Sequence, residues 1–324
     1  MRVIVIGAGN WGTVLAIELA AVLPVCLWAG DVRQAEAIND ARENVKYLPG
    51  YKLPDNVTAE NAYSSAIGAD DILVIAVPSS QVEKVSLELI SQIHSRQMII
   101  SVSKGIVSDS LKTVSEAIEA ILPQAMVAVL TGPTIAREIA AGQPSKAILA
   151  SRHLEVLLKL EKLLKLPHLK FEFSRDVRGV EICAALKGIL AIGVGIAEGL
   201  GLESNIQGII MTYGLKEFKT IARFLQIQEN TIYGLAGMGD LITTCISMDS
   251  RNRRFGHLLA NGVRLQDALS EVGMVVEGVA MAKNIVELSH FNLYIPLFKC
   301  ITRIIFENPA DIYSELVGTI NGIN

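Results

Sequence analysis

Histidine and cysteine are scarce in this sequence, and neither residue type forms a recognisable ligand cluster. The 324 residues include 5 histidines and 4 cysteines, with no Cys-x-x-Cys pair. The cysteines lie far apart, at Cys26, Cys183, Cys245 and Cys300. We therefore expect no metal site and no disulfide framework, and the scattered thiols predict a reducing, cytoplasmic location.

An excess of charge of either sign is also missing. The chain carries 29 Lys and Arg against 33 Asp and Glu, which gives a formal net charge of -4. No general electrostatic field therefore attracts nucleic acid or an anionic membrane, and any anion site must be local. The apolar run at residues 3–6 is too short for a secretory signal.

The most apolar segment, residues 182–197, falls short of a membrane span. It is interrupted by Lys187 and by glycines. We expect a buried helix there and no membrane span.

Hydrophobic residues make up 51% of the sequence and charged residues 19%. This balance supports large buried cores, and the length is more than one core usually serves. The sequence therefore predicts about two folded domains.

The first part of the chain alternates short apolar runs with amphipathic segments. We expect strands at residues 3–6, 25–28, 72–77, 98–102 and 126–130, and additional edge strands at 147–150 and 170–173. We expect helices at residues 11–23, 33–42, 80–93 and 111–121. Such alternation predicts a mostly parallel sheet covered by helices.

After about residue 175 the strand pattern ends, and the remaining segments have helical periodicity. We place the boundary near residues 174–179. The predicted architecture is a dinucleotide-binding α/β domain at residues 1–176 and an all-helical substrate-binding domain at residues 177–324.

Three glycines form a GxGxxG pattern immediately after the first expected strand. Gly7 permits the turn, Gly9 lets a pyrophosphate approach the backbone, and Gly12 allows close packing of helix and strand. Asn10 and Trp11 would lie against a bound cofactor, although Trp11 could equally serve packing. A glycine-rich turn that binds nothing is the alternative, but the strand and helix around it favour a Rossmann-like, doubly wound domain.

Asp31 bears on the choice between NAD and NADP. It follows the second strand, where a carboxylate binds the ribose hydroxyls and repels a 2′-phosphate. Arg33 could instead accommodate NADP, so we favour NAD while keeping both. Asp31 is equally well interpreted as the N-cap of the next helix.

Lys187 is the most informative candidate for chemistry because its helix is otherwise almost without charge. Burial of a lysine is costly and lowers the pKa of the ammonium group toward the range used for acid/base catalysis. The alternative is a lysine whose stem is buried and whose ammonium reaches water.

Three further segments carry candidate ligand-binding groups. Lys104 follows a strand at the edge where open α/β sheets bind ligands, although a solvated lysine is an equal alternative. The turn with Gly132 and Thr134 offers amides and a hydroxyl to a small anion, or is merely structural. Asp240, after a glycine turn, could hold Lys187 or cap the next helix.

A basic segment begins at Ser250 and continues through Arg251, Asn252, Arg253 and Arg254. Its arginines and amide match phosphate oxygens, whereas a single basic run without aromatic residues is poor support for nucleic-acid binding. We therefore expect a small phosphorylated partner, and a solvated face is the alternative.

Taken in order, these segments resemble the bacterial type of the NAD(P)-dependent glycerol-3-phosphate dehydrogenase family over nearly the whole chain. The matching motifs are GAGNWGT at 7–13, NVKYLPGYKLP at 44–54, AVPS at 76–79, SKGI at 103–106, TGPT at 131–134, GVEICAALK at 179–187, LAGMGDLITTC at 235–245, SRNRRFG at 250–256 and VVEG at 275–278.

The resemblance implies an enzyme that interconverts dihydroxyacetone phosphate and sn-glycerol 3-phosphate and supplies the latter for glycerophospholipid synthesis. It implies Lys187 as the general acid/base, with Lys104 and Asp240 as substrate contacts beside it. Substrate-binding positions carried over from the family are Gly132, Thr134, Ser250, Arg251 and Asn252. Cofactor positions carried over are Asn10, Trp11, Lys104, Ala136, Arg251, Val275 and Glu277, beside the glycines at 7, 9 and 12 and Asp31.

Two positions depart from the family pattern. An asparagine often follows the catalytic lysine, whereas this chain has Gly188, so that the hydrogen bond from that position to the substrate is lost. Water or a neighbouring side chain could substitute for it. A histidine or arginine often follows the second strand, whereas this chain has Gly30 and Asp31. This second departure weakens any transfer of NADP preference.

Two other functions stay open at this point. One is another two-domain nicotinamide-dependent dehydrogenase of a small hydroxy acid, which would have no need of Ser250, Arg251 and Asn252. The other is a dinucleotide-binding sensor without turnover, which would have no use for a buried lysine beside a carboxylate. The sequence also leaves a homodimer open.

Overall fold

The computed structural model describes residues 1–63, 65–107, 112–289 and 291–323. The chain forms two compact units. The sheet unit comprises Met1–Ser103 and Val114–Val177, and the helical unit comprises Lys104–Thr113 and Arg178–Asn324. The helical unit therefore includes a short segment that follows a strand of the sheet unit in the sequence.

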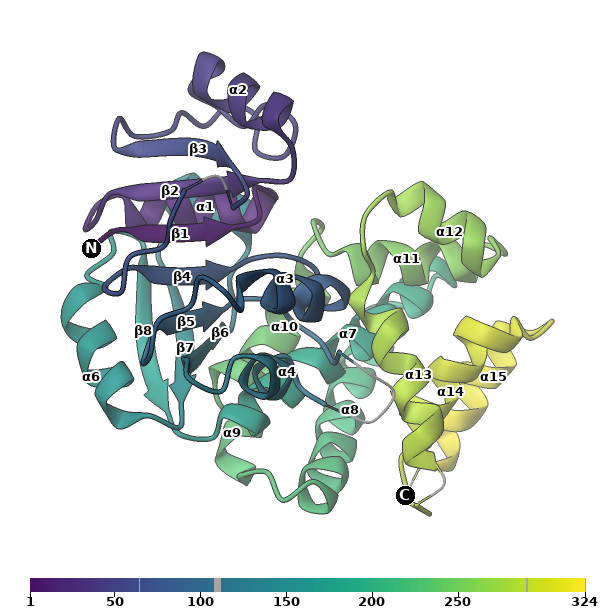
Figure 1. Cartoon of the computed structure of the whole chain (residues 1–324). Helices are drawn as coiled ribbons and strands as arrows, with labels where there is room; N and C mark the ends of the chain where they lie inside the picture. The colour runs from purple at the N-terminus through teal and green to yellow at the C-terminus, as the bar shows by residue number, and fades with distance from the viewer. Residues whose placement is uncertain (64, 108–111, 290, 324) are drawn as a thin grey trace. The chain divides into compact units, whose positions relative to one another are not determined.

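The sheet unit contains an eight-stranded sheet with the order β3-β2-β1-β4-β5-β6-β7-β8 (Figure 1). Neighbouring strands are parallel except for the β6 and β7 pair, which is antiparallel. The strands are β1 (Val3–Ile6), β2 (Val25–Ala29), β3 (Val57–Asn61), β4 (Ile72–Ile75), β5 (Met98–Ser101), β6 (Met126–Thr131), β7 (Ser145–Ser151) and β8 (Leu169–Ser174). The predicted mostly parallel, doubly wound sheet is confirmed.

Two details of the sheet differ from the sequence-based prediction. β3 was not expected, because only its first and third residues are fully buried and its apolar signal is therefore weak. The segment at 147–150 was expected at an edge, but β7 lies between β6 and β8, so that only β8 forms this edge. β7 is buried along most of its length, as an inner strand should be.

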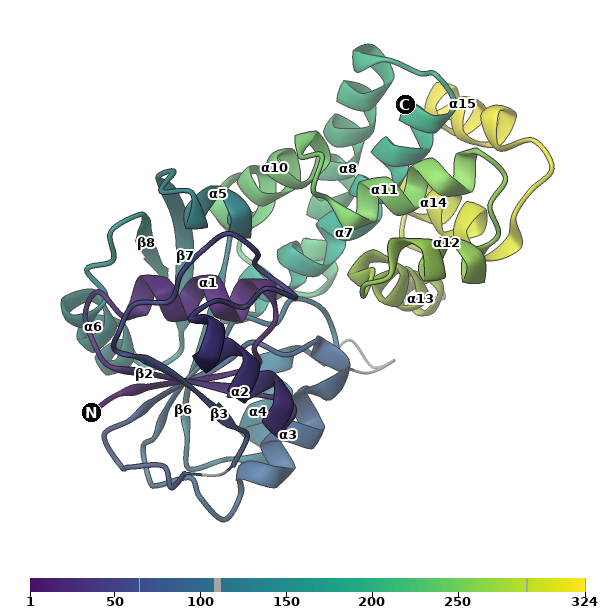
Figure 2. The same cartoon turned by 90° about the horizontal axis from the view of Figure 1, so that it is seen from above.

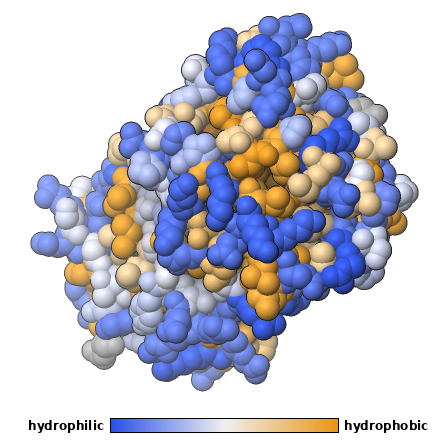
Figure 3. All heavy atoms as spheres, turned by 90° about the vertical axis from the view of Figure 1, so that its left-hand side faces the viewer, coloured by the Kyte–Doolittle hydropathy of each residue, from blue (hydrophilic) through white to orange (hydrophobic). Residues whose placement is uncertain are grey.

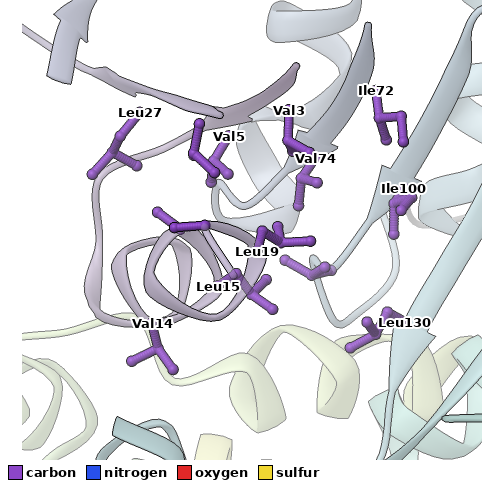
Figure 4. Packing of buried hydrophobic residues seen from close by; sticks show 14 of the residues in the cluster. Val3, Val5, Val14, Leu15, Leu19, Leu27, Ile72, Val74, Ile100 and Leu130 are labelled. Carbon is purple, nitrogen blue, oxygen red and sulfur yellow. The ribbon is translucent and has the colours of Figure 1, made fainter. Parts of the chain in front are cut away.

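Helices cover both faces of the sheet. α1 (Asn10–Leu19) lies over one face, where Leu15 and Leu19 point toward the side chains of β1, β4 and β5 (Figure 4). α3 (Val82–Leu89) and α4 (Val114–Ile121) lie side by side on the other face (Figures 1 and 2). The remaining helices of this unit are α2 (Val32–Ala41), α5 (Ala136–Ala140) and α6 (Leu154–Leu163). The predicted helix at 111–121 is present from Val114, and its first residue, 111, lies outside the described residues.

The helical unit contains no strand among its described residues, which agrees with the predicted change after residue 175. Its helices are α7 (Val177–Gly199), α8 (Ser204–Phe224), α9 (Glu229–Tyr233), α10 (Asp240–Ile246), α11 (Arg251–Ala260), α12 (Leu265–Val272), α13 (Glu277–Ser289), α14 (Pro296–Glu307) and α15 (Ile312–Gly322). α7 is long and apolar enough to cross a membrane by composition alone, yet its most apolar stretch is wholly buried within the protein. The prediction of a buried helix is confirmed.

The surface is mixed in character. Figure 3 shows hydrophilic residues over much of one face, with smaller hydrophobic groups between them. Single exposed apolar side chains such as Leu154 and Leu158 of α6 are ordinary for a folded protein.

A buried carboxylate from α8 holds the start of α14. Glu217 Oε1 and Oε2 accept hydrogen bonds from the backbone N–H groups of Leu297 (2.7 Å) and Phe298 (2.9 Å). Because Ile295 offers no side-chain cap, Glu217 satisfies two of the unpaired N–H groups at this helix terminus. Burial raises the pKa of Glu217 to about 7, despite the opposing effect of the two N–H groups.

We expect the Glu217→Gln substitution to reduce the pH dependence of stability. Since the folded-state pKa of Glu217 lies above its ordinary value of 4.5, its contribution favours folding most below pH 4.5 and declines as the pH rises through about 7. The decline is on the order of 3 kcal/mol. Urea unfolding at pH 5 and pH 8 should show a smaller difference for the variant than for the wild type, whereas Glu307→Gln, at an exposed position of α14, should keep the wild-type difference. An identical difference in all three proteins would refute this assignment.

Candidate functional site

The turn between β1 and α1 requires glycine at two of its three glycine positions. Gly7 has a φ of +119°, and a Cβ there would lie 2.7 Å from the Ala76 carbonyl oxygen. A Cβ at Gly12 would lie 2.0 Å from the Gly7 carbonyl oxygen. A Cβ at Gly9 would meet nothing within 4 Å, so the backbone at Gly9 is open to a close ligand. The turn therefore has the shape that a dinucleotide pyrophosphate requires at the N-terminus of a helix.

Side chains beside this turn have mixed roles. Asn10 begins α1, and its Oδ1 atom is buried without a hydrogen-bond partner in the described part of the chain. Trp11 packs partly against the core of the sheet unit. Asp31 is exposed at the end of β2, and its carboxylate accepts a hydrogen bond from Gln34 N (2.9 Å). The N-cap interpretation of Asp31 is thus confirmed, and this capping leaves its second oxygen available to a ribose.

The turn after β6 also belongs to the sheet unit. Gly132 has a φ of +133°, and Thr134 Oγ1 donates to the Gly132 carbonyl oxygen (3.1 Å). Ala136 begins the short helix α5. Because the hydrogen bond from Thr134 to Gly132 forms within the turn, the turn has a structural role with or without a bound ligand.

Within the helical unit, one carboxylate lies between two ammonium groups. Asp240 Oδ1 is 2.5 Å from Lys187 Nζ, and Asp240 Oδ2 is 3.1 Å from Lys104 Nζ. Lys187 is 6% exposed and Asp240 2% exposed. The predicted burial of Lys187 and its contact with Asp240 are both present, and the Lys104–Thr113 segment brings Lys104 to the same place.

Local structure explains how these three groups meet. Lys187 lies near the middle of α7, whose other side chains are almost all apolar and buried. A π-helical turn at Leu235–Gly239 precedes α10 and places Asp240 as the first residue of that helix. A Cβ at Gly237 would lie 2.1 Å from the Ile232 carbonyl oxygen, so this turn requires glycine to close.

The charges in this cluster shift one another. Burial lowers the pKa of Lys187 from its ordinary value of 10.5 to about 8, the Asp240 carboxylate opposes that effect, and Lys104 adds to it. Burial by itself raises the pKa of Asp240, but Lys104 and Lys187 outweigh burial, and the net pKa of Asp240 is lowered. The cluster is therefore a cationic site with a lysine that can exchange a proton near neutral pH.

Sequence reasoning did not single out Thr244. Its hydroxyl accepts a hydrogen bond from Lys187 Nζ (3.0 Å) and donates to the Asp240 carbonyl oxygen (2.7 Å). The spacing of Asp240 and Thr244 by one helical turn is the signal that could have identified it, because residues four apart share one face of a helix.

Glu277 is electrostatically linked to the same cluster. Burial raises the pKa of Glu277, whereas Arg251, Lys104 and Lys187 oppose that rise. It is the first residue of α13 and follows the exposed Val275 and buried Val276. No independent chemical role for Glu277 follows from the sequence, and its electrostatic interaction with Lys104 and Lys187 links it to the cationic site.

The three arginines of the basic segment differ in their surroundings. Ser250 caps α11 by accepting a hydrogen bond from Arg253 N (3.3 Å). Arg253 makes two hydrogen bonds of 2.8 Å with the Glu198 carboxylate, and Arg254 lies 3.9 Å from Glu271. Arg251 is exposed and has no carboxylate at ion-pair distance within the described residues. Of the three guanidinium groups, Arg251 is therefore the best placed to bind an external anion.

Glycines bring the basic segment against α7. A Cβ at Gly195 of α7 would lie 1.9 Å from the Arg253 carbonyl oxygen, and a Cβ at Gly256 of α11 would lie 2.0 Å from the Ile192 carbonyl oxygen. The two backbones approach this closely only because both residues lack a side chain. The beginning of α11 is thereby fixed beside the helix that carries Lys187.

At Gly188, where much of the family has an asparagine, α7 packs closely against α13. A Cβ at Gly188 would lie 2.9 Å from Gly278 Cα and 3.4 Å from Asn252 Nδ2. Gly278 N donates a hydrogen bond to Asn252 Oδ1 (3.0 Å), which fixes the orientation of that amide. The space beside residue 188 is thus occupied by the backbone of α13 and the amide of Asn252.

Comparison with known families and proteins gives a consistent result over the whole chain. The family models for the N-terminus and the C-terminus of NAD-dependent glycerol-3-phosphate dehydrogenase match residues 2–157 and 176–312. A glycerol-3-phosphate dehydrogenase [NAD(P)+] of Fusobacterium nucleatum is 38% identical over 323 residues, covering 98% of this chain and 96% of that protein. One from a Thermoanaerobacter species is 38% identical and covers 97% of this chain and 96% of its own length.

Solved structures agree with the sequence comparison. The glycerol-3-phosphate dehydrogenase of Coxiella burnetii has a TM-score of 0.90 at 30% identity, covering 99% of this chain and 97% of that chain. The Saccharomyces cerevisiae enzyme has a TM-score of 0.86 at 29% identity, covering 99% of each chain. The chain described here therefore belongs to the NAD-dependent glycerol-3-phosphate dehydrogenase family.

Proposed function

We propose that this protein interconverts dihydroxyacetone phosphate and sn-glycerol 3-phosphate, with Lys187 as the general acid/base. Family membership carries the activity and the use of NAD or NADP. The observation that supports the mechanism is the buried cluster of Lys187, Asp240 and Lys104. The product would supply glycerophospholipid synthesis, and a cytoplasmic location accords with four buried cysteines that form no disulfide among the described residues.

The glycine turn of the sheet unit fits the coenzyme. Gly7 and Gly12 close the turn, and Gly9 leaves room for a pyrophosphate at the N-terminus of α1. When bound, the nicotinamide coenzyme donates or accepts the hydride. We assign coenzyme contacts to these glycines and to Asn10, Trp11, Asp31, Lys104, Ala136, Arg251, Val275 and Glu277. Asp31 favours NAD, because its carboxylate would repel a 2′-phosphate.

The hydrogen bonds of Lys187 prepare it for proton transfer. Its ammonium group has three N–H donors, of which Asp240 and Thr244 accept two. The third can be directed to the ketone oxygen of the substrate. In reduction Lys187 gives this proton to the oxygen as negative charge develops there, and in oxidation it removes the proton from the alcohol.

The anionic end of the substrate requires a separate group of contacts. We assign phosphate and substrate binding to Ser250, Arg251 and Asn252 of the helical unit, together with Gly132 and Thr134. Arg253 and Arg254 each have a carboxylate within 4.0 Å, whereas Arg251 has none at that distance among the described residues, so Arg251 contributes the main charge. The amide of Asn252, beside Gly188, takes the place of the asparagine that follows the lysine in much of the family.

We expect Lys187→Ala to lower the rate of dihydroxyacetone phosphate reduction by about 10²- to 10⁴-fold, the range for loss of general acid/base catalysis. Asp240 keeps Lys104 as an ion-pair partner in this variant, so the fold should persist. The assay follows oxidation of NADH and NADPH separately, with Lys216→Ala of α8 as the control lysine variant. Near-normal turnover of Lys187→Ala would remove the proposed mechanism.

The pH dependence of catalysis should follow the protonation of Lys187. Because reduction needs the protonated amine, kcat/KM for dihydroxyacetone phosphate should fall above about pH 8, where the lowered pKa of Lys187 lies. Oxidation of glycerol 3-phosphate needs the neutral amine and should rise over the same range. Rate profiles in both directions from pH 6 to 10 test this. Profiles that change in the same direction around pH 8 would contradict it.

Arg251→Ala should chiefly raise KM for dihydroxyacetone phosphate, by about 10- to 100-fold, since a hydrogen bond to a charged group contributes about 1.5–3 kcal/mol. Arg254→Ala is the matched control, because Arg254 is exposed on the same helix but lies near Glu271. Its KM should stay within about twofold of the wild type. Steady-state kinetics at saturating coenzyme measure both, and an unchanged KM in Arg251→Ala would exclude the phosphate contact.

We further propose a homodimer, which light scattering of the purified protein would test.

A further inference from the structure

The Ala8 carbonyl, in the middle of the glycine turn, is held by two side-chain amides. Asn44 Nδ2 donates to it at 3.0 Å, and Gln34 Nε2 donates to it at 3.1 Å. Gln34 lies in the first turn of α2, and Asn44 begins the segment 44–54, a motif to which the sequence assigned no function. Two separate parts of the chain thus bind one peptide group of the turn.

Asn44 also reaches the next peptide group through Thr13. Asn44 Nδ2 donates to Thr13 Oγ1 (2.8 Å), and Thr13 Oγ1 in turn donates to the Gly9 carbonyl oxygen (2.8 Å). Asn44 is 1% exposed, so both of its N–H groups are spent inside the protein. The carbonyl oxygens of Ala8 and Gly9 are therefore bound, directly or through Thr13, by the same buried amide.

The orientation of these carbonyls fixes the N–H groups that follow them. A trans peptide is planar, and its C=O and N–H point in opposite directions. When the Ala8 and Gly9 carbonyls point to Asn44 and Thr13, the N–H groups of Gly9 and Asn10 point away from them. These are the amides at the N-terminus of α1, and a Cβ at Gly9 beside them would meet nothing within 4 Å.

We propose that Asn44 is a positioning residue for the coenzyme, because it holds two successive peptides so that the Gly9 and Asn10 N–H groups face the pyrophosphate. Asn44 itself does not touch the coenzyme. Gln34 supports the same carbonyl and is placed by Asp31, whose carboxylate caps α2 at Gln34 N. The two ends of the coenzyme site, at β1 and β2, are coupled in this way. This inference rests on the coenzyme assignment of the proposed function.

The structure offers a matched control in Asn39 of α2. Asn39 Nδ2 donates to the Ala59 carbonyl oxygen (2.8 Å), and Asn39 Oδ1 accepts from Ala59 N (2.9 Å). Like Asn44, Asn39 makes two hydrogen bonds within the sheet unit, but neither reaches the glycine turn. Asn39→Ala thus reports on the loss of two structural hydrogen bonds alone.

The test compares NADH affinity in full-length wild type, Asn44→Ala and Asn39→Ala by fluorescence titration, together with steady-state kinetics. Asn44→Ala should raise the Kd for NADH about tenfold, the equivalent of roughly one lost hydrogen bond. Its KM for dihydroxyacetone phosphate and its kcat at saturating NADH should stay within about twofold of the wild type. Asn39→Ala should lower the melting temperature without changing the Kd for NADH.

If Asn44→Ala does not fold, Gln34→Ala tests the same proposal. This variant removes only the partly buried hydrogen bond from Gln34 Nε2 to the Ala8 carbonyl oxygen. Its Kd for NADH should rise about two- to threefold. A folded Asn44→Ala or Gln34→Ala with wild-type NADH affinity would overturn the proposal, as would equal losses of NADH affinity in Asn44→Ala and Asn39→Ala. A wild type that binds neither NADH nor NADPH would instead overturn the coenzyme assignment itself.

Discussion

The helical unit depends on one buried carboxylate, Asp240, placed between the ammonium groups of Lys187 and Lys104. A lysine in the middle of an apolar helix would be strongly destabilising without a partner, and two neighbouring lysines would repel each other. One carboxylate compensates only one of the two positive charges. The cluster therefore keeps a net positive charge, which suits the oxyanion that forms when a ketone is reduced. In the proposed mechanism, stability and catalysis consequently depend on the same pair of contacts.

Glycine makes the remainder of this arrangement possible. Gly195 and Gly256 let α7 and α11 approach until backbone meets backbone, and Gly188 and Gly278 do the same for α7 and α13. Helices that pack this closely cannot shift by a side-chain width without a clash. The basic segment at residues 250–254 and the start of α13 are thus fixed relative to Lys187 by close backbone packing.

The sequence predicted those features that depend on local pattern. The strands β1 and β4 are apolar throughout and were expected at nearly their observed bounds, and the burial of Lys187 followed from its apolar neighbours. Features that depend on contacts between distant residues were not predictable. Arg253 differs from Arg251 because it pairs with Glu198, which lies 55 residues away in the sequence. No spacing rule in the sequence indicates this ion pair. β3 was missed because an edge strand buries only part of its surface.

The 44–54 segment shows why a motif can be recognised before its physical role is known. Its residues near the turn do not resemble a ligand-binding pattern, because Asn44 is buried and binds backbone rather than ligand. Backbone amides can stabilise an anion only when their direction is fixed before the anion arrives, since reorientation on binding would reduce the affinity. A glycine turn is intrinsically free to reorient. The flexibility that allows close approach thus requires an external constraint, and the side chains of Asn44, Thr13 and Gln34 provide it.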